Sequence, residues 1–180
     1  MTEELDVLRI ISERLRAADV PFMLTGSFAL GLLRQTAHDP RSRLFVVALM
    51  ERHVDALVSA FSTDFYINEG AARSAIKSQR MFNLMHLDSA IKVDLIVRKN
   101  SEYRHAEFER RKSVEFAGIS TWIASREDLI LSKLVWARDT DPEMQLRDVR
   151  TLIDESVDWL YVKDWAAKLG VAAKLNELSK

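Results

Sequence analysis

LTGSFALGLL, at residues 24–33, is the most informative stretch of this 180-residue sequence. The apolar run at 21–24 predicts a buried strand that stops at Thr25, and the apolar residues at 28–33 predict a short helix directly after the turn. Gly26 lets the backbone approach a ligand closely, because glycine has no Cβ. The Ser27 hydroxyl and the unpaired N–H groups at the start of a helix can then bind a phosphate. The same pattern also fits a plain strand-to-helix connection without a ligand.

Composition sets broad limits on the kind of protein. The chain is 48% hydrophobic and 29% charged with a net charge of −1, which is typical of a globular protein of one domain, or one domain with a small appendage. It has no cysteine, and its four histidines are scattered without the i, i+4 pair of a zinc site. No apolar run reaches the ~20 residues that span a bilayer, and the acidic start is unlike a secretion signal. We therefore expect a cytoplasmic protein without a membrane partner.

The hydrophobic periodicity predicts alternating helices and strands. Helices are expected at 3–18, 51–61, 69–77, 126–137 and 143–153, with a closing helical pair at 157–180. Strands are expected at 44–49 and 65–67, in a hairpin of 81–87 with 91–97, and at 114–116 and 121–123. We expect an α+β fold, in which a mixed sheet is flanked by helices. The α/β domain would span 1–123, and a C-terminal helical part at 124–180 would pack on it.

Two charged residues stand in apolar surroundings. Asp94 lies in the middle of the strand at 91–97, where a carboxylate is costly to bury without a partner. It therefore either pairs with an arginine, faces solvent, or ligates a metal. Lys133 lies in an apolar helix, and it either extends to the surface or points at a nucleotide phosphate.

Two other segments carry many charges. Residues 69–80 end in Arg73, Lys77 and Arg80, and residues 98–113 mix both signs. For the first segment a solvated face is favoured over a phosphate-binding patch, and for the second we expect a solvated helix and connector.

Several short motifs together resemble the AbiEii-like nucleotidyltransferases, which belong to the minimal, DNA polymerase β-like superfamily. They are Gly26-Ser27, Lys92-Val93-Asp94, the stretch from Glu127-Asp128 through Lys133-Leu134, and Arg147-Asp148. The resemblance implies transfer of a nucleotide from a nucleoside triphosphate (NTP) to an RNA or protein acceptor, with Mg²⁺ as cofactor. Several members of the family are toxins of toxin–antitoxin or phage-defence systems, so it also implies a cognate antitoxin as a possible partner.

The resemblance also implies roles for single residues. Gly26 and Ser27 would hold the triphosphate, and Asp94 would bind the metal or assist the nucleophile. Lys133 would contact phosphate, and Asp148 would orient Lys133 or the substrate.

The sequence departs from this family at the metal-binding pair. The family has an Asp-x-Asp motif where this chain has Arg41-Ser42-Arg43, and no acidic residue lies between Asp39 and Glu51. Asp94 alone supplies too few oxygen ligands for two Mg²⁺ ions. Arg41 and Arg43 would repel a metal, although they could bind a phosphate directly.

Three interpretations of this departure stay open. Asp39 could be recruited to a rearranged metal site. The chain could be a pseudoenzyme that binds nucleotide or RNA without transfer, or it could serve only as a partner protein. We favour nucleotidyltransferase ancestry with weakened or lost catalysis.

Overall fold

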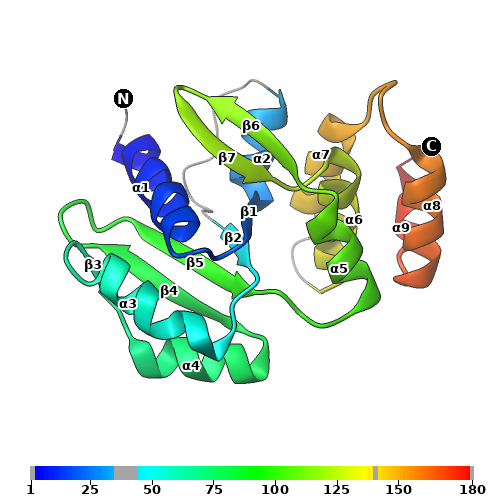
Figure 1. The fold of residues 1–180 in the computed structure, drawn as a ribbon. Helices are drawn as coiled ribbons and strands as arrows, with labels where there is room; N and C mark the ends of the chain where they lie inside the picture. Colours follow the sequence, from blue (N-terminus) through cyan, green and yellow to red (C-terminus); the bar gives the residue numbers. More distant parts are fainter. Residues whose placement is uncertain (1–2, 35–43, 140–141, 179–180) are drawn as a thin grey trace.

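The computed structural model describes residues 3–34, 44–139 and 142–178. Its strands are β1 (Phe22–Thr25), β2 (Leu44–Val47), β3 (Phe65–Ile67), β4 (Met81–His86), β5 (Lys92–Val97), β6 (Lys112–Phe116) and β7 (Ile119–Ile123). They form one seven-stranded sheet in the order β3-β4-β5-β2-β1-β7-β6 (Figure 1). The β1–β7 and β2–β5 pairs are parallel and the other neighbours are antiparallel, which confirms the expected mixed sheet.

Helices flank this sheet. They are α1 (Glu3–Ala17), α2 (Gly26–Arg34), α3 (Val54–Phe61), α4 (Glu69–Ser78), α5 (Glu102–Glu109), α6 (Arg126–Asp139), α7 (Pro142–Leu152), α8 (Trp159–Lys168) and α9 (Ala172–Glu177), with a 3-10 turn, η1 (Glu51–His53), before α3. Of these, α1 to α5 precede or alternate with the strands in the chain, and α6 to α9 follow the last strand. The predicted elements are all present. One difference is that α2 begins at Gly26 rather than two residues later.

A second difference concerns the strands around Gly118, which are longer than predicted. Ala117 and Gly118 both have positive φ, 49° and 75°. Two such residues make the tight turn whose twist matches that of antiparallel strands. Pairing therefore starts directly beside the turn, at Phe116 and Ile119, and continues to the far ends of β6 and β7.

One face of the β3-β4-β5 part of the sheet is covered and the other is open. Alternation along β4 and β5 buries Phe82, Leu84, Val93 and Leu95 on the face that carries α3 and α4. Side chains of the alternate positions, such as Met85, lie on the opposite face and are largely exposed. This open face continues toward the centre of the sheet, where the candidate site lies.

A buried carboxylate joins two of the C-terminal helices, α6 and α8. The Ser125 hydroxyl accepts a hydrogen bond from the Asp128 backbone N–H at 3.1 Å, which makes Ser125 the N-cap of α6. The Asp128 carboxylate in turn accepts hydrogen bonds from the Ser125 hydroxyl at 2.6 Å and from the Tyr161 hydroxyl at 2.8 Å. The start of α6 is thereby tied to α8.

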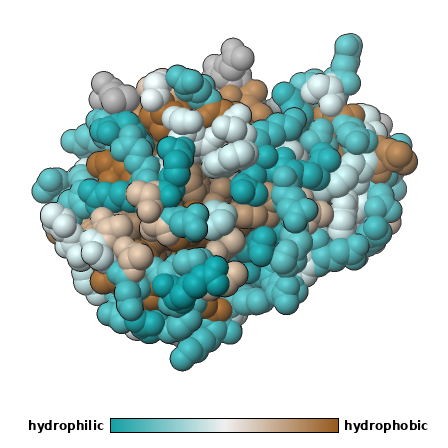
Figure 2. All heavy atoms as spheres, viewed as in Figure 1, coloured by the Kyte–Doolittle hydropathy of each residue, from teal (hydrophilic) through white to brown (hydrophobic). Residues whose placement is uncertain are grey.

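Surface polarity is mixed over the face seen in Figure 2. Hydrophilic side chains dominate this view, and hydrophobic ones gather in small patches between them. Within the described part of the chain, none of the helices combines the length and the apolar character needed to cross a membrane.

Candidate functional site

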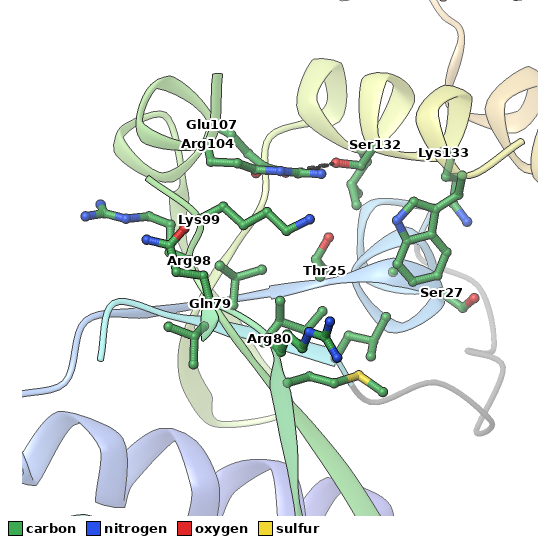
Figure 3. A pocket seen from close by; sticks show the side chains of 18 of the residues that line it. Thr25, Ser27, Gln79, Arg80, Arg98, Lys99, Arg104, Glu107, Ser132 and Lys133 are labelled. Carbon is green, nitrogen blue, oxygen red and sulfur yellow. Dashed lines mark hydrogen bonds and ion pairs between the residues drawn. The ribbon is translucent and has the colours of Figure 1, made fainter. Parts of the chain in front are cut away.

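A cavity of about 410 Å³ lies between the open face of the sheet and α6 (Figure 3). Its volume falls in the range of ~300–1,000 Å³ that is usual for small-molecule sites. The sheet contributes mainly apolar side chains, among them Leu44, Val46 and Ile96. The lining from α6 comprises Leu129, Ser132, Lys133 and Trp136.

The predicted Gly26-Ser27 turn forms one wall of this cavity. Gly26 has a φ of 68°, in the left-handed region that an L side chain rarely adopts. This conformation ends β1 and starts α2 without an intervening loop, so Thr25, Gly26 and Ser27 all line the cavity. The first turn of a helix has N–H groups without partners inside the helix, which can bind an anion.

Lys133 lines the cavity as well and does not extend to the surface. Only 7% of its side chain is exposed, and its Nζ lies 2.7 Å from a carboxylate oxygen of Asp148 on α7. The Gln145 amide oxygen lies 3.5 Å from the same nitrogen. Because a buried cation needs a partner, this ion pair explains how Lys133 is tolerated in an apolar helix. The contact fits an orienting role for Asp148, which stays a prediction.

Asp94 does not line the cavity. Its carboxylate accepts a hydrogen bond from the Asn83 amide, and the Lys92 Nζ lies 3.3 Å from it. The expected pairing therefore occurs within the described residues, with a lysine and an amide in place of an arginine. Leu44 stands opposite both Thr25 and Asp94 in the sheet, so Asp94 is at the same end of the strands as the Gly26 turn.

The part of the chain that the structure describes has no group of three or more acidic or histidine side chains that could hold a metal ion. Arg41 and Arg43, which were predicted to bind nucleotide, lie outside the described residues, as does Asp39. The structure therefore brings together Gly26, Ser27, Lys133 and Asp148, whereas Asp94 is outside the cavity lining, two strands from Thr25 and beside Leu44 in the sheet.

Basic residues other than the predicted Lys133 are the main feature of the cavity that sequence analysis did not favour as site residues. Among the described lining residues are five basic side chains and a single acidic one: Arg80, Arg98, Lys99, Arg104, Lys133 and Glu107. The sequence favours a solvated face for 69–80 and predicts a solvated helix and connector for 98–113. For Arg98 and Lys99 the available signal was their position directly after β5, because connecting segments often carry functional residues.

Arg73 and Arg80 are both on the solvated face that is expected for 69–80, but they have different surroundings. Its guanidinium donates to Glu51 and Asp55 at 2.6 Å each and also pairs with Glu69. These are surface ion pairs, which link Arg73 of α4 to acidic residues of η1, α3 and α4. Arg80, by contrast, starts the turn into β4 and lines the cavity.

Glu107 holds Arg104 in place at the cavity wall. The Glu107 side chain is almost fully buried, its Oε2 accepts a hydrogen bond from Arg104 at 2.7 Å, and its Oε1 accepts one from the Ser132 hydroxyl at 2.9 Å. Burial raises the pKa of the Glu107 carboxyl, and the Arg104 charge and the Ser132 hydroxyl offset this only in part. Arg104 is thus fixed between α5 and α6.

Three solved structures are similar to this fold over most of their length. An antigenic nucleotidyltransferase-like protein from Paracoccidioides brasiliensis aligns with 98% of this chain and 90% of its own, at 16% identity and a TM-score of 0.60. ANT(2″)-Ia, in complex with adenylyl-2″-tobramycin, aligns with 94% of this chain and 98% of its own, at 13% identity and a TM-score of 0.60. The lincosamide antibiotic adenylyltransferase LnuA, with lincomycin bound, aligns with 84% and 96%, at 12% identity and a TM-score of 0.52.

By sequence, no protein-family model and no curated protein matches the chain. The structural similarities show that the chain has a nucleotidyltransferase fold. At these sequence identities the structural similarities are evidence for the fold alone. Membership of the AbiEii-like subgroup stays a prediction from the sequence motifs.

Proposed function

We propose that the protein binds a nucleoside triphosphate in this cavity and neutralises its phosphates with side-chain cations rather than with Mg²⁺ held by paired carboxylates. The charge of the lining carries the proposal, because among the described residues four basic groups surround the cavity (Arg80, Lys99, Arg104 and Lys133) and Glu107 is the one acidic group, while the Arg98 guanidinium lies over the Phe108 ring and extends away from the cavity (Figure 3). Phosphate oxygens accept strong, charge-assisted hydrogen bonds from lysine and arginine. Catalytic transfer would accordingly be weak or lost.

The described residues do not fit the magnesium site that the fold family implies. Mg²⁺ prefers six oxygen ligands in octahedral geometry, of which protein carboxylates are the anchors. Asp94 is already bonded to Asn83 and Lys92, and no acidic residue occurs between Asp39 and Glu51 in the sequence. We therefore derive no step that runs through a metal.

Each part of a nucleotide would meet suitable groups in the cavity. The first turn of α2 and the Ser27 hydroxyl offer hydrogen-bond donors to phosphate, with Lys133 on the facing helix. Ile96, Met81 and Trp136 offer apolar surface for the nucleoside, and an exposed indole provides a face on which a base can stack.

Calorimetric titration of the purified protein with each of the four common NTPs, in buffer containing EDTA, tests the proposal. We expect a heat of binding for at least one of them. Ser27→Ala should weaken that binding because it removes one donor, while Lys163→Gln should not, because Lys163 is exposed on α8 and does not line the cavity. No binding of any NTP would overturn the proposal.

A second candidate is an active nucleotidyltransferase that uses Asp94. It is favoured by the register that places Asp94 and the Gly26 turn at the same end of the sheet. Incubation with α-radiolabelled NTPs, Mg²⁺ and a mixed pool of RNA and protein would then give labelled product, and Asp94→Asn would abolish it. An RNA or protein acceptor, a cognate antitoxin and a cytoplasmic location stay predictions from the resemblance.

A further inference from the structure

Three cations line the cavity from segments other than the Gly26 turn and α6. They are Arg80, Lys99 and Arg104, called the cation rim below. In Figure 3, Lys99 and Arg104 extend across the cavity toward α6, and Arg80 lies across the cavity from them. Ser27 and Lys133 lie together at the other end of the view.

The strand register separates the cation rim from the Gly26 turn. Thr25 and Asp94 both stand opposite Leu44, whereas Val97 stands opposite Val47. Val97 is three residues beyond Asp94, which corresponds to about 10 Å along the strand. Since Gly26 leaves the sheet at the first end and Lys99 follows β5 at the second, the two groups of donors lie at opposite ends of the strands.

The two ends also differ in their free charge. Lys133 is neutralised by Asp148 at 2.7 Å. Among the described residues, Arg80 and Lys99 have no ion-pair partner. Arg104 uses one nitrogen for both Glu107 and Ser132, which leaves further N–H donors of its five for a ligand.

Backbone contacts hold the cation rim in position before any ligand binds. The Val97 N–H donates to the Arg80 carbonyl at 2.9 Å, which ties the start of β4 to the end of β5. The Asn100 N–H donates to the Gln79 side chain at 3.2 Å, so the segment after β5 is tied to the same turn. Of the three cations, Arg104 is paired with Glu107, whereas Arg80 and Lys99 have no acidic partner among the described residues, so an anion beside those two is favourable.

We infer that the cation rim is a second phosphate-binding subsite, so that the cavity holds two phosphate-bearing groups at once. The first is the NTP of the proposed function, on which this part of the inference rests. The second is a phosphate ester of another molecule, either in a nucleic-acid strand or in a small phosphate compound. Its phosphate would lie between Arg80, Lys99 and Arg104.

The test uses two probes with the protein saturated with its NTP: inorganic pyrophosphate, followed by calorimetry, and a fluorescein-labelled, 5′-phosphorylated RNA 12-mer, followed by anisotropy. We expect at least one probe to bind wild-type protein, and the double variant Arg80→Gln/Lys99→Gln to weaken it about tenfold or more. Lys163→Gln is the matched control and should leave binding unchanged. Preference for pyrophosphate or for RNA identifies the source of the phosphate.

Two further outcomes separate this inference from the proposed function. If neither probe binds, or if the double variant binds as tightly as wild type, the inference is overturned, whatever the NTP does. If no NTP binds but a probe binds in a rim-dependent manner, the proposed function fails and the second subsite stands. Circular dichroism of the double variant confirms that it is folded, so a loss of binding reports on the cation rim.

Discussion

The two ends of the cavity hold their positive charges in different ways. At the Gly26 end, Lys133 is buried and forms an ion pair with Asp148. This contact fixes the position of the ammonium group, and the pair as a whole has little net charge. At the cation rim, Arg80 and Lys99 are exposed and have no acidic partner among the described residues. The Gly26 end therefore holds a hydrogen-bond donor in a defined position, whereas the cation rim attracts anions electrostatically. A paired lysine positions one donor, whereas unpaired cations raise the local concentration of anions.

The largest expected effect is on NTP binding when Lys133 is neutralised. Lys133→Gln removes a charge-assisted contact worth about 1.5–3 kcal/mol, so NTP affinity should fall roughly 10- to 100-fold in calorimetric titration. Lys163→Gln is the control. Unchanged affinity in a folded Lys133→Gln protein would mean that Lys133 serves only the ion pair with Asp148.

A salt titration sharpens the contrast between the two ends. Exposed charges are screened by salt far more than buried ones. If RNA binds at the rim, the logarithm of the association constant should decrease linearly with the logarithm of the salt concentration. The slope should be about −2, as expected for three phosphate contacts to a single strand. NTP binding at the Lys133 end should have a shallower slope. Equal slopes would contradict the proposed difference between the two ends of the cavity.

Stability against pH probes the carboxylate that holds Arg104. Burial raises the folded-state pKa of Glu107 above its unfolded value, so the folded state binds the proton more tightly. The stability from this group is fully present below the unfolded pKa and is lost as pH rises through the folded one. The glutamine of Glu107→Gln does not titrate. The melting temperature of this variant, relative to that of wild type at the same pH, should therefore rise as the pH is raised from 4 to 8.

A constant difference in melting temperature over this range would mean that Glu107 has the same pKa in both states. Asp128 also has a pKa raised by burial, but it is present in both proteins and so cancels in the comparison.

The smallest expected effect is a gain in stability at the cation rim. Lys99→Gln relieves repulsion from Arg80 and Arg104, worth roughly a few tenths of a kcal/mol, which is about 1 °C in a chain of this size. Differential scanning fluorimetry at low salt measures it. A loss of stability instead would show that Lys99 has a structural contact, and the repulsion argument would fail.

Much of the fold follows from local sequence patterns. The apolar run before Gly26, the alternation along β4 and β5, and the Ser125 cap each lead directly to an observed element. The Gly26 end of the cavity was also predictable. Gly26 and Ser27 are recognised from the local strand-turn-helix pattern, and Lys133 from its position in an apolar helix and in a family motif. The length of β6 and β7 was not, because it depends on a turn that Ala117 shares with Gly118 at positive φ.

The cation rim could not be predicted from single segments. Arg80, Lys99 and Arg104 come from three elements, and only the sheet order brings them together. In sequence, Arg80 looks like Arg73, although Arg73 is neutralised by three acidic residues on the surface. The buried position of Glu107 was equally hidden, since its segment carries charges of both signs.

The ratio of NTP dissociation constants in EDTA and in excess Mg²⁺, measured by calorimetry on the wild-type protein, tests the central claim most directly. The account predicts ratios within about threefold, since side chains rather than a protein-held metal neutralise the phosphates. Binding that is about 100-fold tighter with Mg²⁺, or that requires it, would contradict the account and point to a metal site that includes Asp94.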